Sequence, residues 1–199
     1  MFDSGISAAE LIKSVKEEAD IAPDIPDKTF LLWLTALEQL LYSEIIKEQK
    51  EIILNPVPKS PITTETLSSK QKGESPVRYE DIHTIYADDR QLIRSTLTSG
   101  VILQDTFFKE RNGIGYHVRA VPNTLRILYF VRPDVKTEGT GGNVMVPAEF
   151  LDLVRAKLRG EAYKLANEDG QAAKWMNDYN ILLETFKAWI AAKEPNFGM

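Results

Sequence analysis

The residue types that could catalyse a reaction or bind a metal are sparse and scattered in this chain. Its two histidines, His83 and His117, are far apart and form no His-x-x-x-His or His-Glu-x-x-His spacing. Both lie in strand-like segments, so we interpret them as partly exposed strand residues. Cysteine is absent, which removes thiolate ligands and thiol nucleophiles. The sequence therefore predicts no metal site, no cofactor and no catalytic site.

Two other features invite comparison with functional motifs. The densest acidic run of the middle region holds Glu80, Asp81, Asp88 and Asp89, but it lacks the regular ligand spacing and turn glycine of an oxygen-rich metal loop. We interpret these carboxylates as capping and solvated groups, and a hydrolase based on them is the weakest functional hypothesis. The glycine-rich run 139–142 matches neither a Walker loop nor a Rossmann loop, which favours a flexible surface loop.

Aromatic side chains are the more informative group. Trp175, Leu182 and Trp189 lie seven residues apart, on one edge of the last predicted helix. Burying a large apolar side chain contributes roughly 1.5–3 kcal/mol, so this edge is expected to be covered. Two interpretations remain open: the edge packs against the predicted helix from Phe30 to Ile46, or it docks another subunit. With Phe197 of the C-terminal tail, these three residues are our candidates for a protein-interaction surface.

The predicted elements that carry this edge form a helical hairpin over residues 147–193. Pro147 suits a first helical position, and Asp169 is an expected N-cap of the second helix. A tight break at 167–170 should make the two helices antiparallel. Apolar residues recur at spacings of three and four in both helices: Leu151, Val154, Leu158, Ala162 and Leu165 in the first, and Ala172, Met176, Tyr179, Leu183, Phe186 and Ile190 in the second.

The N-terminal residues 1–50 predict two further helices. Ser7 and Glu10 have the spacing of a capping box, and this helix should run to about Asp20. Asp27 is an expected cap for a longer helix that ends near Ile46. Because this second helix is apolar around much of its circumference, we expect burial on more than one side, in the fold interior or at a subunit interface.

The middle region, residues 51–146, reads as a β-rich insertion. Strands are expected near 52–54, 77–86, 101–108, 114–118 and 124–131, with a hairpin turn at 111–113 and one short helix over 88–93. Residues 55–76 predict either an extended β-hairpin or arm around Ile62 to Leu67, which in the sharper interpretation reaches a neighbouring subunit, or a mobile loop. The predicted fold is α+β: a mainly α-helical bundle, made of two N-terminal helices and the C-terminal hairpin, with an inserted small antiparallel β-sheet region.

Composition sets the broad class. The chain has 199 residues and 43% hydrophobic residues, which suits a single soluble domain with a tail at 194–199. No apolar run approaches the roughly 20 residues that a membrane-spanning helix needs, and no signal peptide is visible at the N-terminus. The net charge is −5: residues 1–51 carry −6, residues 52–146 carry +2 and residues 147–199 carry −1. An acidic chain without a basic cluster is a poor candidate for direct nucleic-acid binding.

The order of the predicted elements resembles that of the head–tail connector proteins of tailed bacteriophages, also called adaptor or head-completion proteins. The residues that carry the likeness are LRILYFVRP (125–133), VPAEFL (146–151) and the run KLRGEAYKLANEDGQAAKWMNDYNILLETFKAWI (157–190). Those proteins typically pair a strand ending in Arg-Pro with a Pro-Glu-Phe-like helix start and a final helix rich in Tyr and Trp. The segments ELIKSVKEEAD and FLLWLTALEQLLYSEII look like the first helices of the same family.

The resemblance implies a structural virion protein with no enzymatic activity, made in the bacterial host cytoplasm. Its implied partners are the portal protein and tail components in the neck of the particle. It implies a homo-oligomeric ring beneath the portal, twelvefold when assembled, through which DNA passes during packaging without specific binding; no membrane is involved. The alternative from another class is a monomeric protein-binding or regulatory module that uses its C-terminal helical hairpin.

Overall fold

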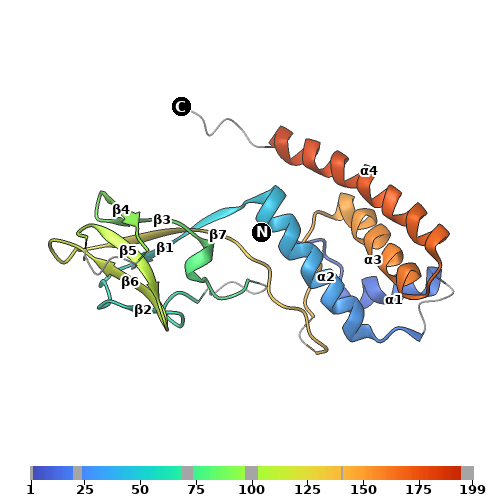
Figure 1. The fold of residues 1–199 in the computed structure, drawn as a ribbon, viewed down its shortest axis with the longest axis horizontal. Coiled ribbons are helices and arrows are strands. Elements are labelled where there is room, and N and C mark those ends of the chain that lie inside the picture. The colour runs from blue at the N-terminus through green and yellow to red at the C-terminus, as the bar shows by residue number, and fades with distance from the viewer. Residues whose placement is uncertain (1, 20–23, 69–73, 97–102, 140, 194–199) are drawn as a thin grey trace. The chain divides into compact units, whose positions relative to one another are not determined.

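The computed structural model describes residues 2–19, 24–68, 74–96, 103–139 and 141–193. The chain divides into two compact units (Figure 1). Residues Met1–Ile46 and Pro133–Met199 form the first, which we call the helical unit, and Lys47–Arg132 form the second, the β unit. The sequence predicts one domain with a β-rich insertion at 51–146, and the compact β unit, Lys47–Arg132, covers most of that insertion.

The helical unit begins with α1 (Ala8–Glu18) and α2 (Asp27–Leu41), and α2 continues into a π-helical turn, η2 (Tyr42–Ile46). The predicted capping box of α1 is confirmed, because Ser7 accepts from the Glu10 amide at 3.1 Å and the Glu10 carboxylate accepts from the Ser7 amide at 3.0 Å. The predicted cap of α2 is wrong. Pro26 occupies the N-cap position, and Asp27 is the first helical residue, paired with Lys16 at 2.5 Å.

The predicted C-terminal hairpin is formed by α3 (Leu151–Leu165), which follows a short 3-10 turn, η4 (Ala148–Phe150), and by α4 (Asp169–Lys193). The two helices lie side by side (Figure 1). Phe150 near the start of α3 contacts Phe186 near the end of α4, whereas Gly160 faces Met176, so the helices are antiparallel. Asp169 stands inside α4 as its first residue rather than before it.

The core of the helical unit lies between α1, α2 and α3, and one stripe of α4 closes it. That stripe is Ala172, Tyr179, Phe186 and Ile190. The expectation that α2 is buried on more than one side is met only in part. Phe30, Leu34 and Leu41 are fully buried, but Leu32 is 62% exposed and Leu40 is 50% exposed.

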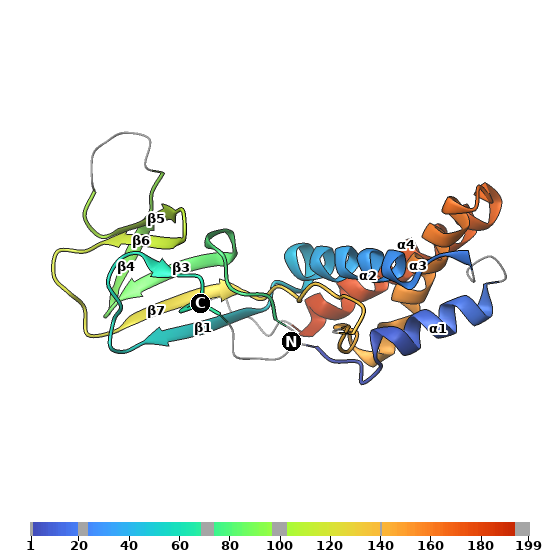
Figure 2. The same cartoon turned by 90° about the horizontal axis from the view of Figure 1, so that it is seen from below.

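The β unit contains a seven-stranded sheet in the order β1-β7-β3-β4-β5-β6-β2. Figure 2 shows that this sheet is curled, like half of a barrel. The pair β4–β5 is parallel and the other pairs are antiparallel. The strands are β1 (Gln49–Leu54), β2 (Ile62–Thr63), β3 (Ile82–Ala87), β4 (Arg90–Arg94), β5 (Thr106–Glu110), β6 (Gly113–His117) and β7 (Leu125–Phe130). The prediction of a small inserted sheet is therefore wrong in size, whereas its mainly antiparallel pairing is confirmed, with β4–β5 as the parallel exception.

The turn at Asp88 explains part of this error. The expected helix over 88–93 is instead a tight turn followed by strand β4, and Asp88 has a left-handed φ of 51°. An aspartate tolerates that conformation better than most residues. Its Oδ1 accepts from the amides of Asn123 and Thr124 at 2.9 and 3.0 Å. A carboxylate that looked like a helix cap therefore connects two turns of the sheet.

The described part of the segment 55–76 packs against its own chain. Ile62 pairs with Ile114 of β6, and the side chains of Ile62 and Leu67 are 0% and 1% exposed. Glu74 is also buried, where it forms an ion pair with Lys50 and accepts from the Tyr129 hydroxyl at 3.3 Å. Through these contacts the segment extends the sheet by strand β2 and covers part of the buried face of the sheet.

Candidate functional site

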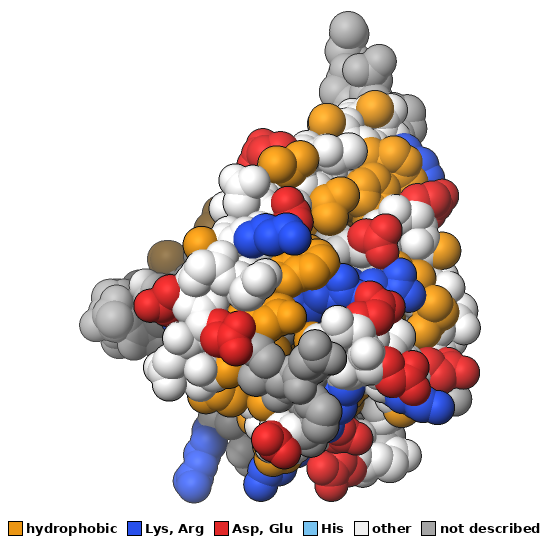
Figure 3. Space-filling view, turned by 90° about the vertical axis from the view of Figure 1, so that its right-hand side faces the viewer, with side chains coloured by type: hydrophobic (Ala, Val, Ile, Leu, Met, Phe, Trp, Pro, Cys, Tyr) orange, Lys and Arg blue, Asp and Glu red, His pale blue; other side chains and the backbone are white. Residues whose placement is uncertain are grey.

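A surface groove of about 510 Å³ runs along α3 and α4 in the helical unit. Trp175 and Leu182, two of the predicted interaction residues, both line it. Their side chains are half-buried, and Ile181 beside them is 59% exposed. The space-filling view of the helices shows basic side chains set among apolar and acidic ones (Figure 3). The remaining lining residues are Glu18, Asp152, Arg155, Ala156, Arg159 and Asp178.

Two arginine side chains, Arg155 and Arg159, line this groove. The Arg159 guanidinium lies 4.5 Å from the centre of the Trp175 ring and pairs with Glu18. Arg155 pairs with Asp152 at 2.8 Å. The Nε atoms of both arginines are buried without a hydrogen-bond partner among the described residues. Burial lowers the pKa of the Arg159 guanidinium, although it remains charged at neutral pH.

Asp178 differs from the other charged groups of the groove. It is half-buried between Trp175 and Leu182, one turn along α4 from each. Within the described part of the chain it forms no ion pair and no hydrogen bond through its carboxylate. The groove therefore presents one unpaired carboxylate and two aliphatic side chains beside an indole ring that Arg159 and Lys174 already approach, at 4.5 and 5.6 Å from the ring centre.

The third predicted residue, Trp189, is placed elsewhere on α4. Its ring lies 5.2 Å from the ring of Phe150, 5.8 Å from that of Phe2 and 6.2 Å from that of Phe186. Lys193 lies over the same ring at 3.7 Å. Trp189 therefore belongs to an aromatic cluster inside the helical unit. Phe197 lies outside the described residues.

The predicted edge therefore does not act as one surface. α4 packs chiefly on α3 and makes a smaller contact with η2, which lies within the predicted helix from Phe30 to Ile46. Trp189 is used for packing, whereas Trp175 and Leu182 line an open groove. A spacing of seven residues puts these side chains along one edge of the helix, but the elements packed beside the helix decide which part of that edge is covered.

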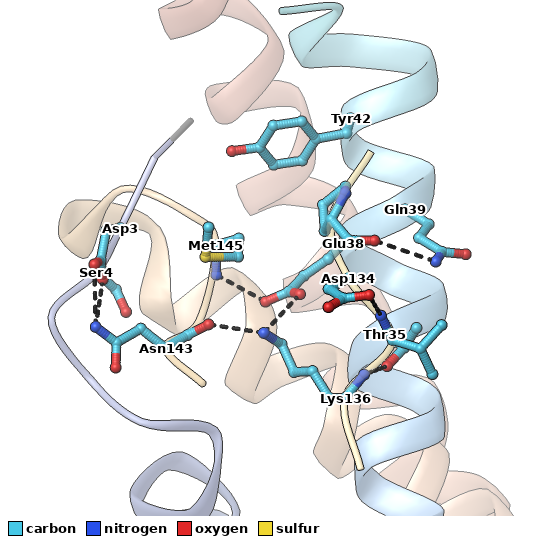
Figure 4. Close-up of polar contacts among 12 residues, drawn as sticks. Asp3, Ser4, Thr35, Glu38, Gln39, Tyr42, Asp134, Lys136, Asn143 and Met145 are labelled. Atoms are coloured by element: carbon cyan, nitrogen blue, oxygen red, sulfur yellow. Dashed lines mark hydrogen bonds and ion pairs between the residues drawn. The ribbon is translucent and has the colours of Figure 1, made fainter. Parts of the chain in front are cut away.

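Sequence reasoning missed a buried polar cluster under α2 (Figure 4). The Glu38 carboxylate accepts from the Met145 amide at 2.8 Å and pairs with the Lys136 ammonium at 3.1 Å. Lys136 also donates to the Asn143 carbonyl at 2.7 Å, and its amide donates to Thr35 Oγ1 at 3.0 Å. Burial raises the pKa of the Glu38 carboxyl, partly offset by Lys136. The available signal was a glutamate inside an apolar run of α2.

This cluster stabilises structure, because the buried Glu38 and Lys136 charges are paired with each other and each is hydrogen-bonded to the backbone. It holds the described residues of segment 133–146 against the helices. Gly142 accepts from the Ala8 amide at 2.9 Å, and the Asn143 side chain donates to the Asp3 carboxylate at 3.0 Å. The described glycine-loop residues therefore anchor the start of α1.

The remaining candidates from the sequence are also accounted for. Glu80 pairs with Lys109, and Asp81 pairs with Arg132 at 3.3 Å. His83 contacts the ring of Phe130, and His117 stacks on Phe108 at 5.0 Å. Among the residues with described positions, no group of three His, Cys, Asp or Glu side chains is placed to hold a metal ion.

Neither the scan against family models nor the search of curated proteins found a match. Across the described ranges, none of the helices combines the length and the apolar character needed to cross a bilayer.

Proposed function

We propose that this protein is a head–tail connector of a tailed bacteriophage, a structural virion protein that docks beneath the portal and joins the capsid to the tail. The proposal begins from the sequence resemblance over 125–133, 146–151 and 157–190. The observation that carries it further is the exposed apolar surface of the helical unit. Leu32, Ala36 and Leu40 follow one face of α2 at spacings of four, and all three are exposed.

An exposed apolar stripe indicates a docking surface, because an isolated protein would gain by covering it. The groove beside Trp175 provides a second surface with a large aromatic anchor, of the kind found at interaction hot spots. A protein that carries two such surfaces on one helical unit suits a role between several partners. In the proposed role those partners are the portal protein, tail components and further copies of the chain in a twelvefold ring around the DNA channel.

The experiment is a binding measurement with the portal protein from the same phage genome. We expect co-elution and a mass increase in size exclusion coupled to light scattering. Leu40→Asp should weaken this complex because it places a charge on the apolar stripe, while Gln171→Asp, at an exposed position of α4, should not. Absence of any complex at high concentration of both proteins would contradict the connector function.

The groove also supports the second candidate, a monomeric protein-binding or regulatory module that uses the α3–α4 hairpin. That function predicts a partner bound through Trp175 with one copy of each chain. A one-to-one complex with a host protein, formed by a chain that does not bind portal, would favour it over the connector. Genes for portal or capsid proteins beside this one would favour the connector.

A further inference from the structure

Strand β1 forms one edge of the seven-stranded sheet, and the outer side of this strand is unpaired (Figure 2). The Val131 amide donates to the Glu48 carbonyl at 2.8 Å, and hydrogen bonding alternates along an antiparallel pair, so every second residue of β1 points its backbone toward β7. The backbone groups of Gln49, Glu51 and Ile53 therefore point away from the sheet. No described residue forms a backbone hydrogen bond with them on that side.

The opposite edge of the sheet, strand β2, is protected against pairing with another chain. It has two residues and follows Pro61, which has no N–H. The Thr63 carbonyl already accepts from the Leu67 amide at 3.2 Å. Strand β1, by contrast, has six residues, contains no proline and pairs with β7 without a bulge. Because proteins usually protect exposed strand edges, the unprotected edge indicates a strand that pairs with another chain.

The second half of β1 carries exposed apolar side chains. Ile53 is 58% exposed, and Ile52 and Leu54 are half-buried. The residues opposite Ile52 and Leu54 on β7, Ile127 and Leu125, are fully buried, so the buried face of the sheet is less covered at the β1 edge than one strand further in. A segment that covers this half of β1 must therefore be extended, to satisfy the backbone, and apolar, to match the side chains.

The same three residues of a second copy meet this requirement, because they are complementary to themselves. Two β1 strands paired antiparallel about Ile53 place Ile53 opposite Ile53 and Ile52 opposite Leu54, apolar against apolar on both faces. The Ile53 backbone points outward, so the two copies of this residue can exchange both hydrogen bonds. The other symmetric registers match less well. Pairing about either charged residue of the strand opposes two like charges, pairing about Ile52 opposes Glu51 with Ile53, and pairing about Leu54 opposes Ile52 with Pro56.

We propose that the free chain dimerises through β1, with the two strands antiparallel and Ile53 on the two-fold axis. The sheets of the two β units then form one continuous sheet, and the apolar half of each β1 covers that of the other copy. Two copies in such an isologous contact point in opposite directions, whereas the copies of a ring around a channel all point in the same direction. The dimer is therefore a state of the chain outside the ring, and the inference goes beyond the connector function.

Charged substitutions at Ile53 test the dimer in sedimentation velocity over a series of protein concentrations. Ile53→Lys and Ile53→Glu should each weaken dimerisation by about tenfold or more, because two like charges then lie opposite each other on the axis. An equal mixture of the two variants should recover the dimer, since a lysine then lies opposite a glutamate. Val121→Lys is the matched control: this valine is also an exposed apolar residue of the β unit, but it lies between β6 and β7.

Cross-linking tests the register independently, because the chain contains no cysteine. Ile52→Cys and Leu54→Cys chains are mixed in the absence of portal protein and oxidised. Residues 52 and 54 of the two copies form a pair without backbone hydrogen bonds, in which the side chains lie closest. We therefore expect the disulfide-linked heterodimer to exceed both homodimers. Ile52→Cys mixed with Thr63→Cys, an exposed position of the opposite sheet edge, is the control and should give little product.

Each of three results overturns the inference: a chain that stays monomeric at the highest concentration measured, an Ile53→Lys chain that dimerises as well as Val121→Lys, or a heterodimer yield no higher than in the cysteine control. The outcomes also separate this inference from the connector function. A chain that binds portal but is monomeric alone keeps the function and loses the dimer. A chain that dimerises through β1 but never binds portal keeps the dimer and loses the function.

Discussion

Glu38 and Lys136 form an ion pair with 3.1 Å between Oε2 and Nζ, and their side chains are 0% and 6% exposed. The pair joins α2 to the segment that leads back from the β unit to α3. Each group has one further partner, the Met145 amide for Glu38 and the Asn143 carbonyl for Lys136. Burying two charges is tolerable only when both are paired and hydrogen-bonded, so the cluster should respond strongly to the loss of one member.

The first prediction concerns that loss. Glu38→Ala leaves the Lys136 ammonium buried without a counter-ion, which should lower the free energy of unfolding of the helical unit by about 3–5 kcal/mol. Tryptophan fluorescence in a urea titration is a selective readout, because Trp33, Trp175 and Trp189 all belong to this unit. The double variant Glu38→Met with Lys136→Met should lower the free energy of unfolding by much less than the sum of the two single substitutions. Additive effects would show that the two charges do not stabilise each other.

The second prediction is a pH dependence with a defined sign. Burial raises the pKa of the Glu38 carboxyl above its ordinary value of 4.5. The folded state therefore binds the Glu38 proton more tightly than the unfolded state does. The contribution of this proton to the free energy of unfolding is complete below about pH 4.5, and it decreases as pH rises through the pKa of the folded state. Glu38→Gln should remove this decrease. The measurement is the difference between the urea-unfolding free energies of the two proteins from pH 4 upwards; a difference that is constant with pH would contradict the raised pKa.

The sequence predicted the helical unit well because its signals are local. The Ser7–Glu10 capping box and the apolar periods of α3 and α4 depend on residues within one or two turns of each other. The cluster of Glu38 and Lys136 depends on residues about a hundred positions apart, and nothing in either segment alone indicates the other. The candidate groove was predicted in part. The sequence indicated Trp175 and Leu182, whereas Arg159 joins them only because α3 packs against α4.

The β unit was predicted less well because strand pairing is set over long distances. Most strands were found near their true positions, yet their order in the sheet and the parallel pairing of β4 with β5 have no local signal. Asp88 shows how one residue type supports two interpretations. An aspartate before Arg90 suits a helix cap, but the same side chain also accepts from amides in a turn, and the tertiary contact with Asn123 decides the outcome.

The third prediction tests the packing of β2 on β6. A side chain at Gly113 would place its Cβ 1.9 Å from the Ile62 carbonyl oxygen, a backbone atom that cannot move aside alone. Gly113→Ala should therefore separate β2 from β6 and destabilise the β unit by about 1–3 kcal/mol or more. Hydrogen exchange of the amides in β5 and β6 is the readout, with Asn112→Ala in the same exposed turn as control. Equal protection in both variants would contradict the close approach.

The fourth prediction separates the two tryptophans that the sequence grouped together. Trp189 packs against three aromatic rings of its own chain, so Trp189→Ala should lower the stability of the helical unit by about 2–4 kcal/mol, near the range for a large aromatic lost from a core. Trp175 lines an open groove, so Trp175→Ala should cost about 1 kcal/mol or less and act mainly on association.

Urea unfolding followed by circular dichroism at the helical signal measures the first effect, and sedimentation velocity measures the second. If Trp175→Ala unfolds the unit as readily as Trp189→Ala, the groove residue is part of the core; if it leaves both stability and association unchanged, Trp175 has no role in binding.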